Sequence, residues 1–244
     1  MLVASQAQAA ELTLLVGGSM ATPFREIGAE FARSTGNKLK FVINTTGALQ
    51  KRMRAGEKAD IIMISARGMD ELEREQLILS GSRVELATAE IGVSVRSGAV
   101  SPDLSTPDAF KRAMLAARSI ALVDPKAGGT SGIYLDGLFQ KLGIADEVRG
   151  KAVFGNVGSS VADAVASGKA ELGLTFISEM LPNKGVKIAG PLPGRLQRPT
   201  VYVVAIPAAS SHKDEARAFV AAISSPSAWP SIAGAGLTPL RREP

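Results

Sequence analysis

Four short segments that combine glycine with hydroxyl side chains lie where a strand is expected to end and a helix to begin. They are Gly18-Ser19, Thr45-Thr46-Gly47, Gly129-Thr130-Ser131-Gly132 and Gly155-Asn156-Val157-Gly158-Ser159. The N-terminus of a helix presents unpaired N–H groups and the positive end of the helix dipole, so it attracts anions without a formal charge. Any single turn of this kind is an ordinary helix cap. If all four converge on one cleft, they form a cage for an anion.

Two arginines are candidates for a charged contact in the same region. Arg67 follows the apolar run at residues 61–65, and Arg198 precedes a stretch typical of a strand at residues 200–206. An arginine beyond the end of a strand can pair with a carboxylate through two parallel hydrogen bonds. The alternative for both is a solvated loop arginine, and the sequence leaves that choice open.

The composition excludes several other kinds of chemistry. The 244 residues include no cysteine and one histidine, His212, so zinc–thiolate sites, iron–sulfur clusters, cysteine nucleophiles and histidine relays are not expected. Ser131 lacks the flanking pattern of a hydrolase nucleophile. The net charge of +5 reflects 28 basic and 23 acidic residues, which is a mild excess. We therefore expect a small anionic ligand, no metal, no cofactor and no nucleic acid partner.

Apolar runs that alternate with helical patterns position these turns. Buried strands are predicted at residues 12–16, 38–44, 59–65, 119–123, 151–154 and 172–177. A helical pattern follows each of them. This rhythm predicts an α/β fold with mostly parallel sheets flanked by helices, in which ligands bind beyond the carboxyl ends of the strands.

The rhythm resets near residue 90 and again near residue 199. We therefore expect two lobes with a ligand cleft between them, residues 11–89 with 200–244 forming lobe 1 and residues 90–199 forming lobe 2. Residues 1–10 are similar to the tail of a secretory signal peptide that ends in an Ala-x-Ala cleavage site, which predicts a periplasmic location. Elsewhere no run of 18 apolar, uncharged residues occurs, so no membrane-spanning helix is expected.

Several motifs, in order along the chain, resemble the periplasmic molybdate-binding proteins, which are type 2 solute-binding proteins of ABC importers. The motifs are Gly-Ser-Met at 18–20, Thr-Gly-Ala-Leu-Gln-Lys-Arg-Met at 46–53, Ala-Asp-Ile-Ile-Met-Ile-Ser-Ala at 59–66, Gly-Asn-Val at 155–157 and Ala-Glu-Leu-Gly-Leu-Thr-Phe-Ile-Ser-Glu at 170–179. The resemblance implies a two-lobed periplasmic binding protein type 2 fold. It also implies a monomer that closes on a small oxyanion and delivers it to a membrane ABC permease.

The same resemblance implies which residues contact the ligand. They are Ser19, Thr46, the turn with Thr130 and Ser131, Val157 through its backbone, and Phe176. Phe176 departs from the family, whose molybdate binders typically have a tyrosine there, so one hydroxyl donor is lost. The loop at residues 127–132 is richer in glycine and hydroxyls than in those proteins, and Arg67 adds a full charge. These departures favour a larger anion such as an organic carboxylate.

A branch that resembles this family is enzymatic and interconverts cis- and trans-aconitate by an allylic proton shift. That reaction needs anchors for the carboxylates and one group that acts as acid and base. Tyr134, Lys51, Glu179 or a deprotonated hydroxyl are candidates, and their spacing does not single out any of them. The expected function is therefore a solute-binding protein for a small oxyanion or organic carboxylate. An aconitate isomerase-like activity is the alternative, and whether the protein is an enzyme stays open.

Overall fold

Three parallel strands near the N-terminus form one side of the first sheet in the computed structural model, which describes residues 9–240. β1 (Glu11–Gly17) lies between β2 (Lys38–Asn44) and β3 (Ile61–Ser65). Every residue of β3 is buried, as an apolar strand covered on both faces should be. The six-stranded sheet is completed by β4 (Val84–Ala89), β10 (Thr200–Ala205) and β11 (Leu237–Pro239), in the order β11-β4-β10-β3-β1-β2.

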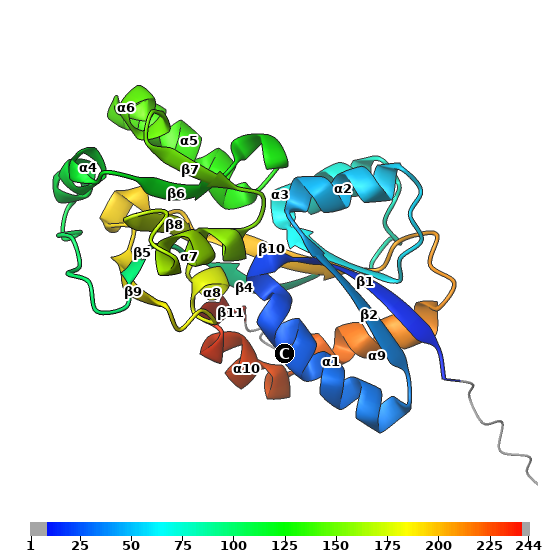
Figure 1. The fold of residues 1–244 in the computed structure, drawn as a ribbon. Coiled ribbons are helices and arrows are strands. Elements are labelled where there is room, and N and C mark those ends of the chain that lie inside the picture. Colours follow the sequence, from blue (N-terminus) through cyan, green and yellow to red (C-terminus); the bar gives the residue numbers. More distant parts are fainter. Residues whose placement is uncertain (1–8, 241–244) are drawn as a thin grey trace, which may run out of the picture.

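A second, five-stranded sheet is formed by the middle of the chain. Its strands are β5 (Ile91–Arg96), β6 (Ile120–Val123), β7 (Ala152–Gly155), β8 (Leu172–Phe176) and β9 (Val186–Pro191), in the order β7-β6-β8-β5-β9. The chain passes from the first sheet to the second at Glu90, and it returns between β9 and β10. Figure 1 shows the two sheets, each with its own helices, and the gap between them.

The α/β class predicted from the sequence is confirmed, but the expectation of mostly parallel sheets is wrong. Both sheets are mixed: β1, β2 and β3 pair in parallel, as do β6, β7 and β8. The antiparallel pairings involve β4, β5, β9, β10 and β11. β4 and β5 precede and follow the first crossing, and β9 and β10 the second. A strand that enters or leaves a sheet at a crossing is not bound by the β–α–β connection that makes neighbouring strands parallel.

Helices cover both sheets. The first sheet carries α1 (Ala21–Thr35), α2 (Thr46–Arg54), α3 (Ala66–Arg74), α9 (Lys213–Ser224) and α10 (Trp229–Gly234). The second carries α4 (Pro107–Ala116), α5 (Thr130–Leu142), α6 (Ala145–Arg149), α7 (Gly158–Ala166) and α8 (Ile177–Met180). Single 3-10 turns are η1 (Gly18–Met20), η2 (Pro125–Ala127), η3 (Gly194–Leu196) and η4 (Pro226–Ala228). No helix in the described part of the chain is long and apolar enough to cross a membrane.

Aromatic packing joins the two ends of the chain on the first sheet. Phe219 of α9 contacts Phe24 and Phe31 of α1, with ring centroids 5.8 and 5.2 Å apart. Burying each such ring stabilises the fold by roughly 2–3 kcal/mol.

His212 and Ser210, just before α9, hydrogen-bond the buried carboxylate of Asp60, at 3.2 and 2.8 Å. His212 therefore helps to hold α9 beside β3. The predicted signal-peptide remnant at residues 1–10 falls largely outside the described residues.

Candidate functional site

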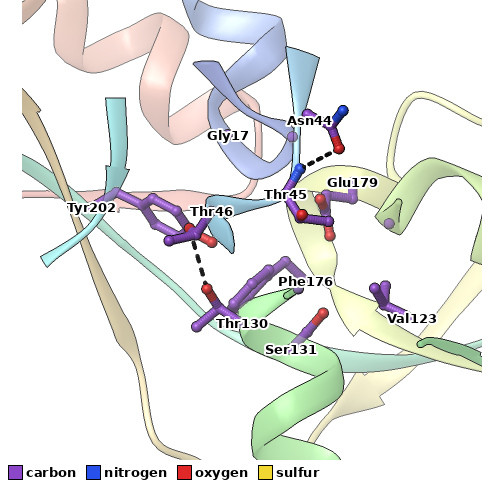
Figure 2. Close-up of a pocket in the computed structure, with 13 residues that line it drawn as sticks. Gly17, Asn44, Thr45, Thr46, Val123, Thr130, Ser131, Phe176, Glu179 and Tyr202 are labelled. Atoms are coloured by element: carbon purple, nitrogen blue, oxygen red, sulfur yellow. Dashed lines mark hydrogen bonds between the residues drawn. The ribbon is translucent and has the colours of Figure 1, made fainter. Parts of the chain in front are cut away.

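The turns that begin α2 and α5 touch across the gap between the two sheets. The Gly47 backbone N–H donates to the Gly128 carbonyl at 3.0 Å, and Thr45 Oγ1 donates to the Ala127 carbonyl at 2.6 Å. Thr130 Oγ1 donates to Thr46 Oγ1 at 3.4 Å (Figure 2). These bonds join residues from the two sheets, so the structure represents a closed arrangement of the cleft. Two of the four predicted turns are thereby brought into direct contact.

Glycine is required at this contact because the two backbones approach so closely. A Cβ on Gly47 would lie 2.8 Å from Gly128 Cα and 3.2 Å from its carbonyl oxygen. Neither atom can move aside as a side chain could. Gly128 also has a φ of 72°, a conformation that side chains disfavour. Glycine at both positions is what allows the two sheets to close at this point.

A small cavity of about 20 Å³ lies beside this contact, and we call it the cage. Its wall consists of Gly17, Gly18, Asn44, Thr45, Thr46, Val123, Gly129, Thr130, Ser131, Gly158, Phe176, Glu179 and Tyr202. The wall therefore contains four of the predicted binding residues: Thr46, Thr130, Ser131 and Phe176. In the closed form the cage has room for about one water molecule. A ligand can enter only if the sheets separate and the side chains shift.

Among the threonine and serine hydroxyls of the cage wall, Thr46 is the one whose proton the described hydrogen bonds leave for a ligand. Thr46 Oγ1 accepts hydrogen bonds from the Ser65 backbone N–H and from Thr130 Oγ1, each at 3.4 Å. Both of its acceptor positions are thus used, and its own proton is left for a ligand. Ser131 Oγ lies 3.1 Å from Thr175 Oγ1 in the second sheet. Because Thr175 donates its proton to Glu179, Ser131 is the donor in its bond to Thr175. On this side the cage therefore offers an anion the backbone N–H groups of the first turn of α5, which have no acceptor within the helix.

The other three predicted binding residues lie beside the cage or beyond it. Ser19 follows Gly18 and is 2% exposed. Its Oγ has no well-aligned hydrogen-bond partner among the described residues, although it is near enough to the Tyr202 phenol to lower that pKa. Val157 precedes the wall residue Gly158, and its carbonyl accepts a hydrogen bond from Ser160 Oγ at 2.6 Å. Arg67 lines a different and larger cavity.

Glu179 is the acidic group of the cage. It lies at the start of α8 in the second sheet, and burial raises the pKa of its carboxyl to about 7. Thr175 Oγ1, which donates to Glu179 Oε2 at 2.6 Å, opposes that rise, as does the Phe176 backbone. The described residues of the cage wall include no lysine, arginine or histidine that could neutralise it. Glu179 is therefore half protonated near neutral pH, and an anion placed beside it favours the protonated form.

Two glycines leave room for this carboxyl. A Cβ on Gly18 would lie 2.5 Å from Glu179 Oε1, and one on Gly158 would overlap with Oε2. Gly18 belongs to the first sheet and Gly158 to the second, so the carboxyl group occupies the junction between them. Among the acid/base candidates, Glu179 is the one that the structure places in the cage wall. Tyr134 lines the larger cavity, and Lys51 is exposed on α2 and lines neither cavity.

Tyr202 is the cage residue that the sequence analysis missed. It lies on β10 of the first sheet, is 3% exposed, and packs edge-to-face against Phe176 with ring centroids 5.7 Å apart. Burial, and next the nearby Glu179, raise its pKa, while the Ser19 and Thr130 hydroxyls lower it less. The phenol therefore keeps its proton and can donate. It supplies, from the facing sheet, the hydroxyl that Phe176 lacks, and it reaches the cage through the antiparallel pairing of β10 with β3, for which the local sequence gives no signal.

The larger cavity, of about 540 Å³, adjoins the cage at Thr46 and Thr130, whose side chains line both. Its wall also contains Arg67, Arg198 and Tyr134. The structure thus brings both candidate arginines to one space next to the cage. Within residues 9–240, no three histidine, cysteine, aspartate or glutamate side chains gather as a metal site would require.

Known proteins resemble this chain over nearly its whole length. Residues 12–238 match the model of the family described as bacterial extracellular solute-binding protein. The aconitate isomerase of a Pseudomonas species is 32% identical over 239 residues, which cover 96% of this chain and 89% of that protein. The molybdate-binding protein ModA of Azotobacter vinelandii is 28% identical over 211 residues, 81% of this chain and 78% of that protein.

The structural likeness extends over both sheets. The solved periplasmic molybdate-binding protein of Azotobacter vinelandii superposes with a TM-score of 0.80 at 21% identity, over 95% of this chain and 100% of that chain. This likeness confirms the periplasmic binding protein fold predicted from the sequence. With the same two-sheet fold and a family match from residue 12 to residue 238, the chain belongs to the bacterial extracellular solute-binding proteins and has the architecture of ModA.

Proposed function

We propose that this protein captures a small oxyanion or organic carboxylate in the cleft between two lobes and delivers it, in the periplasm, to a membrane ABC permease. Lobe 1 comprises residues 11–89 and 200–244, and lobe 2 comprises residues 90–199. The observation that carries the proposal is the meeting of helix N-termini from both sheets around the cage, through Gly47, Thr46, Gly128 and Thr130. Each lobe supplies only part of the donor set, so the ligand favours the closed form over the open one.

The ligand contacts follow from the cage wall. Thr46 contributes its hydroxyl and Tyr202 its phenol from the first lobe. The second lobe contributes the N–H groups of the turn with Thr130 and Ser131 and the backbone at Val157–Gly158. The buried Ser19 hydroxyl, which has no hydrogen-bond partner among the described residues, lies beside the cage. Phe176 shapes the wall and does not donate. An anion held in this way displaces water from groups that are already oriented, which keeps the cost of binding low.

A second candidate function, isomerisation of the bound carboxylate, is favoured by Glu179. A buried carboxyl with a pKa of about 7 is suited to accept and return a proton at neutral pH. In an allylic shift, the ionised carboxyl removes a proton from the CH₂ group next to the double bond. The C–H electron pair becomes the new double bond, and the electrons of the former double bond take the proton back at the far carbon. The step is balanced without an oxidant, and the relative named aconitate isomerase supports this candidate.

One experiment separates the two candidates. The thermal midpoint of the purified protein is measured with molybdate, tungstate, sulfate, phosphate, citrate, cis-aconitate and trans-aconitate, and each stabilising anion is then incubated with the protein and followed by proton NMR. Stabilisation without any change in the spectrum supports capture alone. Conversion of one aconitate isomer into the other by the wild-type protein supports the isomerase. In that case Glu179→Gln should lose the conversion while the anion still stabilises the protein. No stabilisation by any of these anions would refute both.

A further inference from the structure

The larger cavity beside the cage is a charged chamber, and its wall joins both lobes. It is lined by Thr46, Gly47, Gln50, Ser65, Ala66, Arg67, Gly68, Glu71, Gly128, Thr130, Ile133, Tyr134, Arg198, Pro199, Thr200 and Val201. Because Thr46 and Thr130 line this chamber and the cage alike, a group held in one is adjacent to a group held in the other. A single ligand of several carbons can therefore occupy both.

Arg67 and Arg198 reach the chamber from distant parts of the chain, Arg67 after β3 and Arg198 in the segment that leads into β10. Arg67 lies in the first turn of α3, directly after β3 of the first sheet. Arg198 follows η3, which contacts α4 on the second sheet. Two positive charges therefore line one space next to the cage.

Both arginines are exposed, and neither takes part in an ion pair with any described residue, whereas several others do: Arg52, Arg54, Arg83, Arg118 and Arg149. The acidic residue in the described wall of the chamber, Glu71, is already engaged. It accepts hydrogen bonds from Gln50 Nε2 at 2.9 Å and from Arg54 at 3.4 Å. The chamber therefore retains unneutralised positive charge.

The remaining wall suits the hydrocarbon part of a ligand. Ile133 lines the chamber and is 52% exposed, an unusual position for a large apolar side chain. Tyr134 is held beside it by a hydrogen bond from its hydroxyl to the Leu196 carbonyl at 2.8 Å. Burial raises the pKa of Tyr134, and the charge of Arg198, which lines the same wall, opposes that rise. A wall that combines apolar surface with two arginines matches a short carbon chain that carries carboxylates.

We propose that the chamber is a second anionic subsite, in which Arg67 and Arg198 bind the distal carboxylates of a ligand whose first carboxylate occupies the cage. The ligand class is then a short di- or tricarboxylate, because a single tetrahedral oxyanion in the cage leaves both arginines unneutralised. This inference rests on the proposed capture of an anion in the cleft. Guanidinium groups suit the role, since each can hold a carboxylate through two hydrogen bonds.

The test compares affinities across ligands of increasing charge by isothermal titration calorimetry. The probes are molybdate, acetate, succinate, citrate and trans-aconitate, and the variants are Arg67→Gln and Arg198→Gln. Arg195→Gln is the matched control, because Arg195 is exposed on η3 and lies outside the described wall of the chamber. Each chamber variant should weaken citrate or trans-aconitate roughly tenfold or more, as expected for a lost charged hydrogen bond. In the chamber variants, the affinity for molybdate or acetate should stay within about twofold of the wild-type value. In the control variant, the affinity for every probe should do the same.

The outcomes distinguish this inference from the proposed function. If the polycarboxylates bind but both chamber variants bind them like wild type, the second subsite is refuted while anion capture stands. If molybdate or acetate binds more tightly than every polycarboxylate, the ligand class is wrong. If wild-type protein binds none of the probes, the proposed function fails first. Arg67→Lys keeps the positive charge but cannot form two parallel hydrogen bonds to one carboxylate. It should therefore recover part of the affinity that Arg67→Gln loses, and full recovery would rule out paired hydrogen bonding at Arg67.

Discussion

Replacing Glu179 by glutamine should change how the stability of the protein depends on pH, and this can be measured without knowing the ligand. The carboxyl has an ordinary pKa of 4.5 and a pKa of about 7 in the folded protein. An acid whose pKa is higher in the folded than in the unfolded state stabilises the fold while it is protonated in both states. That contribution is fully present below about 4.5, falls as the pH rises, and levels off above about 7.

The magnitude follows from the same two values. Each pKa step corresponds to about 1.4 kcal/mol, so the rise from 4.5 to about 7 costs wild type about 3 kcal/mol of stability at pH 8. Glutamine has nearly the same shape, stays neutral, and can still accept the hydrogen bond from Thr175. The free energy of unfolding of Glu179→Gln minus that of wild type should therefore increase by about 3 kcal/mol between pH 4.5 and pH 8.

Urea denaturation followed by circular dichroism at intervals of half a pH step gives this difference directly, since other titrating groups cancel between the two proteins. Glu171→Gln is the control, because Glu171 accepts a hydrogen bond from the Arg118 backbone and its pKa is lowered. Its difference curve should slope in the opposite direction around and below pH 4.5, and it should be nearly flat from there to pH 8. A Glu179 curve that stays flat from pH 4.5 to pH 8 would show that the carboxyl is ionised in the fold, and the proton-transfer role would fall with it.

Three further outcomes are expected. Gly47→Ala should place a Cβ against the Gly128 backbone and hold the lobes apart. Anion affinity should then fall roughly tenfold or more, and the radius of gyration with ligand, measured by X-ray scattering, should increase. The thermal midpoint without ligand should stay near that of wild type. Tyr202→Phe should remove one donor from the cage and weaken anion binding roughly tenfold in calorimetry, and unchanged affinity would exclude the phenol from the site. Asp60→Ala should leave the Thr13 N–H without its acceptor and reduce the free energy of unfolding in urea by about 1–3 kcal/mol, with anion affinity unaffected.

The sequence predicted the parts of the site that local structure determines. A glycine or hydroxyl residue directly after an apolar run marks a strand-to-helix turn, so Thr46, Thr130 and Ser131 could be identified without knowing any tertiary contact. Their meeting follows from the rule that ligands bind beyond the carboxyl ends of parallel strands. That rule also extends to Arg67, which lies beyond the end of β3 and lines the adjoining chamber.

The parts that the sequence did not predict depend on distant segments. Tyr202 reaches the cage because β10 pairs antiparallel with β3 after the second crossing, where Tyr202 lies opposite Ser65. An acidic residue in the first turn of a helix, such as Glu179, is ordinarily solvated and favoured by the helix dipole. Its burial arises because Gly18 and Gly158, from different lobes, leave space for it. Neither fact is visible in the residues adjacent to Tyr202 or Glu179.

The distribution of charge explains how one cleft can select among anions. Under the proposed function, the cage binds an anion through neutral donors, and an anion beside Glu179 raises the pKa of that carboxyl further. Buried donors of this kind are little affected by salt, whereas the exposed guanidinium groups of Arg67 and Arg198 are screened within about 8–10 Å at ordinary ionic strength. A ligand that uses the cage alone should therefore bind almost equally at low and high salt, and a ligand that reaches the chamber should bind less tightly as salt is added. The net charge of +5 does not by itself determine affinity. Under the proposals above, affinity depends on two arginines that have no ion-pair partner among residues 9–240 and that adjoin a cage whose described wall contains no cationic side chain.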